Sequence, residues 1–120
     1  MGGTDWLIAS NIRSATDAMC TALATVGKKV KSGEIETSSQ VEMMAWAFSI
    51  ARPDWDECGE NTFCRSAGGK IEIRPDDDIK TLTLKVVRIE QGPDELAANG
   101  FTEEKLVKMI DDEVKDFMRR

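Results

Sequence analysis

The chain has 120 residues, of which 41% are hydrophobic and 32% are charged, proportions that indicate a globular protein rather than a disordered one. Its 16 basic and 22 acidic residues give a net charge of −6, which repels phosphate backbones and weighs against general nucleic-acid binding. Because this length is close to the commonest domain size, we expect a single globular domain over residues 1–120.

The N-terminus and the hydropathy pattern predict a cytoplasmic protein without a membrane partner. The opening stretch, MGGTDWLIASNIRS, lacks the basic segment and the long apolar run of a signal peptide. The longest unbroken apolar run, Met43 to Phe48, is much shorter than the ~20 residues of a membrane-spanning helix. Gly2 is not expected to be myristoylated, because Trp6 stands where that signal has serine or threonine.

A long helix is predicted over residues 5 to 31. Thr4 or Asp5 can cap its start, and lysines followed by Gly33 are typical of a helix end. Its apolar residues recur at intervals of three and four, which places on one face Ile8, Ile12, Ala15, Met19, Leu23, Val26 and Val30.

A second helix is predicted to begin at Ser39, because Ser39 and Glu42 have the spacing of a capping box. Pro53 ends it. Its body, VEMMAWAFSIA, is apolar on nearly every face. Such a helix must be covered on several sides, by other elements or by another subunit.

Residues 54 to 69 show neither helical nor strand periodicity and are predicted to form a long connection. Beyond it, KIEIR at 70–74 and TLTLKVVRIE at 81–90 have the alternating apolar residues of strands. PDDDIK at 75–80 is expected to form the turn of this hairpin. The alternation breaks at Val86 and Val87, which indicates a bulge or burial on both faces.

Two further helices are predicted after the hairpin. Gly92 and Pro93 begin a short one that stops at Asn99 and Gly100. The last helix begins at Thr102 and buries a stripe formed by Leu106, Ile110, Val114 and Phe117.

These elements predict an α+β fold, in which amphipathic helices pack on a small antiparallel sheet built around a β-hairpin. A sheet of two strands is too small for the helices that must cover it. Either the connection at 54–69 contains another strand, or a second chain completes the core.

The segment DWDECGENTFC combines two cysteines and a tryptophan with four carboxylates. A zinc site is disfavoured, because the chain has no histidine and the gap between Cys58 and Cys64 is wider than usual for paired ligands. A disulfide between them is geometrically possible. The favoured interpretation is that both thiols are reduced, that Trp55 and Phe63 turn inward, and that the acidic side chains stay in water.

No catalytic, metal-binding or cofactor-binding residue is predicted. Asp76, Asp77 and Asp78 are expected to form a solvated turn, because the ligand spacing of a calcium loop is absent. Without histidine the commonest general base is missing, and no serine or cysteine has an evident substitute beside it. Gly68 and Gly69 lead into a strand rather than into a helix that could hold a phosphate.

The adaptable, apolar side chains of the second helix suggest a function. Met43, Met44, Trp46 and Phe48 are of types common at protein interfaces as well as in cores. We therefore expect a non-catalytic protein–protein interaction module, with a protein partner or as a homo-oligomer, that associates through these four residues. The alternative is a small enzyme or ligand-binding domain that uses the 54–64 loop and the 75–80 turn.

Overall fold

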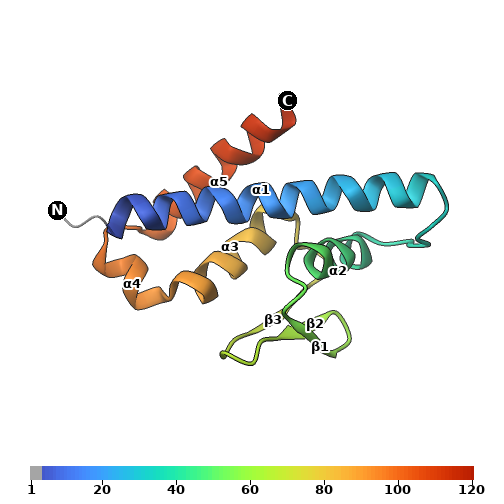
Figure 1. Ribbon diagram of the computed structural model, residues 1–120, viewed down its shortest axis with the longest axis horizontal. Helices are drawn as coiled ribbons and strands as arrows, with labels where there is room; N and C mark the ends of the chain where they lie inside the picture. The colour runs from blue at the N-terminus through green and yellow to red at the C-terminus, as the bar shows by residue number, and fades with distance from the viewer. Residues whose placement is uncertain (1–3) are drawn as a thin grey trace.

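The computed structural model describes residues 4–120, which fold into five helices and one three-stranded antiparallel sheet, so the predicted α+β class is confirmed (Figure 1). The expectation about Gly2 lies outside the described residues. In chain order the elements are α1 (Thr4–Lys31), α2 (Gln40–Ala51), β1 (Asp56–Gly59), β2 (Thr62–Cys64), β3 (Lys70–Glu72), α3 (Ile79–Gln91), α4 (Pro93–Ala98) and α5 (Glu103–Met118).

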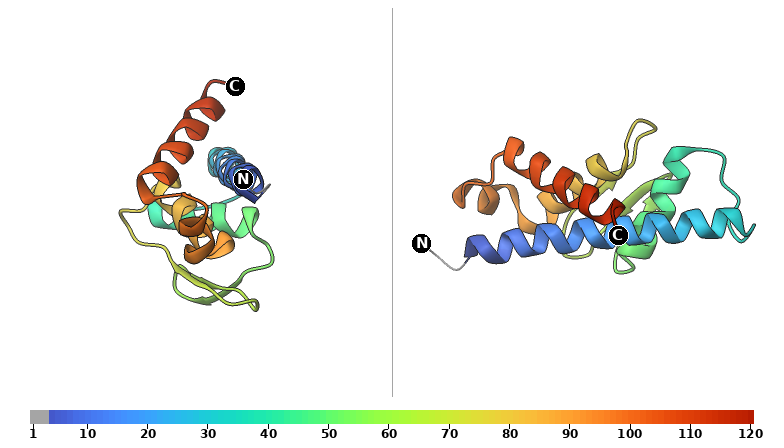
Figure 2. Two further views of the ribbon diagram at one scale, coloured as in Figure 1. Left: turned by 90° about the vertical axis from the view of Figure 1, so that its left-hand side faces the viewer. Right: turned by 90° about the horizontal axis from the view of Figure 1, so that it is seen from above.

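Helix α1 sets the long dimension of the molecule. Its 28 residues extend over about 42 Å, in a molecule whose principal extents are 50, 34 and 23 Å. Helices α2 and α3 pack along one side of α1, and α5 crosses it at an angle (Figure 2). The predicted helix over residues 5 to 31 is thus confirmed, and most of its apolar stripe is buried.

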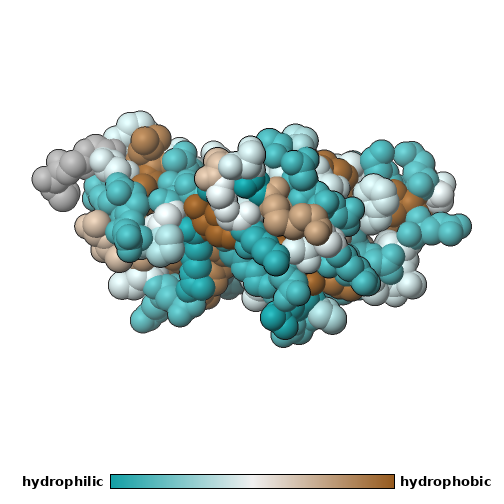
Figure 3. All heavy atoms as spheres, turned by 90° about the horizontal axis from the view of Figure 1, so that it is seen from below, coloured by the Kyte–Doolittle hydropathy of each residue, from teal (hydrophilic) through white to brown (hydrophobic). Residues whose placement is uncertain are grey.

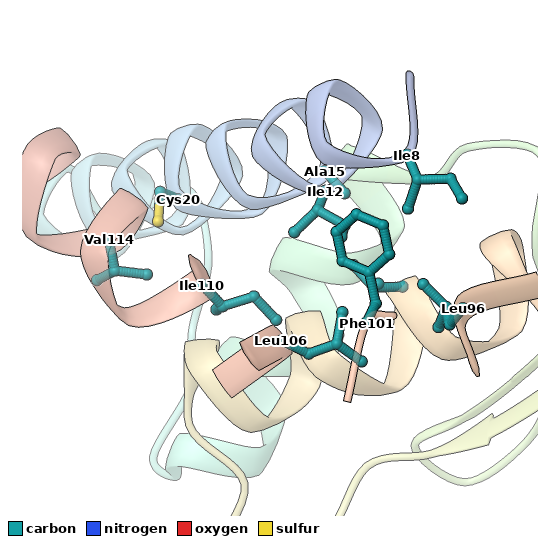
Figure 4. Packing of buried hydrophobic residues seen from close by; sticks show 10 residues of the cluster. Ile8, Ile12, Ala15, Cys20, Leu96, Phe101, Leu106, Ile110 and Val114 are labelled. Carbon is teal, nitrogen blue, oxygen red and sulfur yellow. The ribbon is translucent and has the colours of Figure 1, made fainter. Parts of the chain in front are cut away.

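One cluster of buried side chains joins the first half of α1 to the C-terminal helices (Figure 4). Ile8 and Ile12 of α1 belong to this cluster together with Leu106 and Ile110 of α5, as the predicted stripes of both helices require. Phe101, in the turn before α5, fills the space between these helices and α4.

A second cluster explains how α2 is covered. Met44 and Phe48 of α2 pack with Met19 of α1 and with Phe63 and Trp55 of the sheet region. One side of α2 therefore rests on α1 and another on the sheet, which lies below α2 in Figure 1. Two sides of this apolar helix are therefore covered by other elements of the same chain.

The prediction of a second hairpin strand over 81–90 is wrong, because this segment forms helix α3. Its buried residues are Leu82, Thr83, Val86 and Val87, which follow helical spacing. The break in alternation at Val86 and Val87 therefore reflects the helical period. Asp78 caps this helix by accepting from the Thr81 N–H at 2.9 Å.

The hairpin that the fold does contain lies in the segment predicted as a long connection. β1 and β2 pair antiparallel with Glu57 opposite Phe63, and β2 pairs with β3. Of the two expected ways to complete the sheet, the structure therefore uses strands within 54–69, two of them rather than one. Seen from below, the side that carries the sheet is largely hydrophilic, with small and separate hydrophobic patches (Figure 3).

The bond between Cys58 and Cys64 corrects the expectation of reduced thiols. These two cysteines form a disulfide with their Cα atoms 6.0 Å apart, which links β1 to β2. The register shifts between Glu57 and Gly59, and this bulge carries Cys58. Cys20, the remaining cysteine, is buried in α1, and burial raises the pKa of its thiol.

The acidic turn before α3 is also not uniformly solvated as expected. Asp77 is buried; it accepts from the Arg74 N–H at 2.8 Å and forms an ion pair with Lys85 at 2.6 Å. Burial acts to raise the pKa of Asp77, but these hydrogen bonds outweigh it and hold the pKa below its ordinary value. Asp78 serves as the cap of α3, and Asp76 alone is an exposed residue without such a role.

Candidate protein interface

The outer face of α2 carries large apolar side chains that the chain itself leaves uncovered. Met43, Trp46 and Ile50 are spaced three and four residues apart, so they lie on one stripe of the helix. Trp46 is 45% exposed and Ile50 40% exposed, whereas Met44 and Phe48 on the inner faces are 5% and 0% exposed. Met43 is half-buried and packs against the cluster that contains Ala22 and Val26 of α1, so Trp46 and Ile50 are the exposed part of the stripe.

A cleft of about 510 Å³ opens beside this stripe, between α2 and β1. Trp46 forms part of its wall and so joins the cleft to the exposed face of the helix. The lining residues are Glu42, Ala45, Trp46, Ser49, Pro53, Trp55, Asp56, Glu57, Asn61 and Phe63.

Aromatic side chains form the buried side of the cleft. Phe48 meets Trp55 edge to face, with ring centroids 5.2 Å apart, and lies 4.6 Å from the Phe63 centroid. Arg65 lies over the Trp55 ring at 5.4 Å. Trp55 is only 5% exposed, and its indole N–H has no acceptor within residues 4–120, which leaves a buried donor unsatisfied.

The charged residues that line the cleft are all acidic. Glu42, Asp56 and Glu57 line it, and within the described chain no lysine or arginine does. Glu42 accepts hydrogen bonds from the hydroxyls of Ser39 and Ser38 at 3.1 and 3.4 Å, so its carboxylate is held by the start of α2. In the part of the chain that is described, Asp56 and Glu57 form no ion pair within 4.0 Å.

Local contacts fix the two elements that build the cleft. Ser39 accepts from the Glu42 N–H at 3.3 Å, which confirms the predicted start of α2. The Glu42 side chain binds hydroxyls rather than the backbone N–H of a complete capping box. At the other end, Arg52 binds Glu90 of α3 through two hydrogen bonds of 2.7 and 2.9 Å, which anchors the helix in place.

The structure separates the four predicted interface residues into two pairs. Trp46 lies on the outer face with the half-buried Met43, while Met44 and Phe48 lie in the core of the same chain. That these residues reach an interface stays a prediction, and Trp46 is the one best placed for it. Ile50 and Trp55 were not predicted as part of this surface; the four-residue step from Trp46 to Ile50 was the available signal for the first of them.

The alternative, a small enzyme or ligand-binding domain, requires a compact pocket lined by Asp54, Asp56, Cys58 and Asp76. Asp56 lines the cleft, but Asp54, Cys58 and Asp76 do not. Cys58 is bound to Cys64, and Asp77 is paired with Lys85. Within residues 4–120 no group of three or more cysteine, aspartate and glutamate side chains is positioned to hold a metal ion.

Comparisons with known proteins give no assignment for this site, so its interpretation rests on its geometry. No protein-family model, curated protein or solved structure matches the chain. Among the helices of residues 4–120, none has both the length and the apolar character needed to cross a bilayer.

Proposed function

We propose that this chain is a non-catalytic protein–protein interaction module, which binds its partner through the exposed stripe of α2 and the adjoining cleft. The observation that carries the proposal is the exposure of Trp46 and Ile50 on a helix whose other sides are buried. Single exposed apolar residues are ordinary on protein surfaces, whereas a group of them beside a cleft is typical of interaction sites. Tryptophan is also the residue type that most often contributes large binding energy at interfaces.

Peptide selection tests this proposal even though the partner has not been identified. Peptides from a random display library are selected on the folded protein and then measured against two variants. The site variant is Trp46→Ala/Ile50→Lys; the control is Val107→Lys, at a position on α5 that is 49% exposed. We expect the selected peptides to bind the control and to lose binding to the site variant. Equal binding to both variants would place the preferred surface elsewhere and overturn the proposal.

Self-association is the form of binding expected from the sequence, and it stays a prediction. Two copies meeting face to face across a twofold axis would bring Glu42, Asp56 and Glu57 of both chains together. Such like charges oppose that particular arrangement. Sedimentation velocity over a range of protein concentrations measures whether the chain associates with itself, and the site variant shows whether α2 is responsible.

The cytoplasmic location expected from the sequence stays a prediction. The Cys58–Cys64 disulfide weighs against it, because such bonds persist mainly in oxidising compartments. Blocking free thiols before cells are opened, followed by mass measurement, shows whether this bond exists where the protein resides.

A further inference from the structure

Building on the proposed interaction module, we infer that the cleft between α2 and β1 binds a short basic segment of a different protein. In this arrangement an apolar side chain of the segment contacts the aromatic wall, and flanking lysine or arginine residues pair with the acidic rim. The inference rests on the proposed function, since it names the partner of the same surface.

The acidic residues of the cleft favour a partner of positive charge. Glu42, Asp56 and Glu57 line the cleft without a cation among its lining residues in the described chain, and the whole molecule has a net charge of −6. A cleft lined by one sign of charge concentrates ligands of the opposite sign and accelerates their association. Asp56 and Glu57 form no ion pair within residues 4–120, so a partner's cations need not displace any.

The walls of the cleft are partly apolar. Ala45, Pro53, Trp46 and Phe63 give the cleft apolar surface beside its acidic rim. Trp46 is exposed, and an indole face attracts arginine and lysine as well as apolar groups. The combination fits a segment that is both basic and apolar, rather than a free metal cation, for which these aromatic walls provide no ligands.

The indole N–H of Trp55 is a hydrogen-bond donor without an acceptor among the described residues. This residue lines the cleft and is only 5% exposed. Polypeptide segments supply carbonyl acceptors along their whole length. The indole nitrogen is itself buried in the free chain, so a peptide carbonyl reaches it when the wall of the cleft shifts on binding.

The volume limits the size of the occupant. At about 510 Å³ the cleft falls within the range of pockets that hold small ligands, roughly 300 to 1,000 Å³. It accommodates a few side chains of a segment rather than the surface of a globular domain. The exposed side chain of Ile50, next to Trp46 on α2, extends the contact beyond the cleft.

Titration with designed peptides tests the inference. Three peptides of equal length are compared by calorimetry: one with a central leucine flanked by lysines, one with glutamines in place of the lysines, and one with serine in place of the leucine. We expect the first to bind most tightly, and its affinity to fall as salt is added, because exposed charges are screened.

Two charge variants locate the binding. Asp56→Asn/Glu57→Gln removes rim charges, and Glu104→Gln/Asp112→Asn makes the same change in charge on α5. We expect the rim variant to bind the basic peptide about tenfold more weakly, the loss that two exposed ion pairs account for, and the α5 variant to bind normally. Circular dichroism checks that both variants are folded.

The outcomes separate this inference from the proposed function. If the glutamine peptide binds as tightly as the basic one and still requires Trp46, the module stands and the basic partner is wrong. Equal binding of the basic peptide to both charge variants also overturns the inference. If no peptide binds and the wild type associates with itself through Trp46, the occupant is a second copy and the inference is wrong. If neither happens, both the inference and the proposed function fail.

Discussion

Asp17 and Glu113 bring two carboxyl groups together where α1 meets α5. Arg120 reaches both, with its Nη2 3.4 Å from Glu113 Oε2 and 3.6 Å from Asp17 Oδ1. The neighbouring carboxyl group of Asp17 and, after it, burial raise the pKa of Glu113 above its ordinary value of 4.5. A carboxyl pair of this kind favours retaining a proton in the folded state.

The raised pKa of Glu113 determines how the free energy of unfolding changes with pH. A group whose pKa is raised by folding adds stability that is present below its unfolded pKa and is lost as pH rises through its folded pKa. Glu113→Gln removes this titration and keeps a hydrogen-bonding side chain. We therefore expect the free energy of unfolding of the wild type to fall relative to Glu113→Gln as pH rises above 4.5. A difference that stays constant in urea denaturation across this window would contradict the assignment.

The lowered pKa of Asp77 predicts a pH dependence of stability opposite to that of Glu113. Substitution of Asp77 should also cost more stability than substitution of its neighbour Asp76. The lowered pKa of Asp77 adds stability above the unfolded pKa, which is lost as pH falls through the folded pKa. Replacing Asp77 by Asn removes the ion pair with Lys85 and should cost about 1 to 3 kcal/mol. Asp76→Asn, at an exposed position, should cost at most about 0.5 kcal/mol. Equal losses in urea denaturation would show that the ion pair of Asp77 adds no stability.

At the scale of elements, the sequence predicted the helices with a clear stripe or cap. The start of α2 follows from Ser39 and Glu42, and the stripes of α1 and α5 appear in the core as expected. The prediction failed for α3 because Leu82, Leu84 and Val86 alternate by chance on a helix. β1 and β2 have four and three residues, too few to show a period of two.

The sequence predicted that α2 carries the candidate interface, but it did not predict which face of the helix is exposed. An all-apolar helix does not reveal which of its faces tertiary packing will cover. The choice between Met44 as core and Trp46 as surface depends on where α1 and the sheet lie. The acidic rim could not be predicted, because Asp56 and Glu57 resemble loop residues until β1 places them opposite α2.

The two faces of α2 should respond differently to the same change. Met44→Lys places a charge at a position that is 5% exposed and should abolish cooperative folding, whereas Ile50→Lys, at 40% exposure, should leave the fold intact. Far-ultraviolet circular dichroism with thermal unfolding measures both. A folded Met44→Lys or an unfolded Ile50→Lys would refute the assignment of these faces.

At the scale of the whole molecule, two clusters of buried residues share α1 and α3 but use different partners. The cluster with α5 and α4 contains no residue of the sheet, whereas the cluster with α2 does. The disulfide lies in the sheet and closes a short loop of the chain. The helical half of the core therefore does not depend on that bond directly.

Reduction of the disulfide should accordingly weaken the fold without abolishing it. The loop between Cys58 and Cys64 spans a sequence separation of 6, for which the chain-entropy model gives about 2 kcal/mol. We expect Cys58→Ser/Cys64→Ser to unfold cooperatively at a lower temperature, in the presence or absence of a reductant. Loss of a cooperative transition in calorimetry would mean that the sheet and its bond are required for folding.

Hydrogen exchange shows whether α2 and the adjoining cleft form a binding surface. Backbone amide exchange is measured for the free protein and for its complex with a peptide from the selection. Binding at this surface predicts slower exchange in α2 and in the β1–β2 hairpin, including Trp46 and Glu57, with α5 unchanged. Protection confined to the surface of α3 and α5, or unchanged exchange in α2 despite peptide binding, would contradict it.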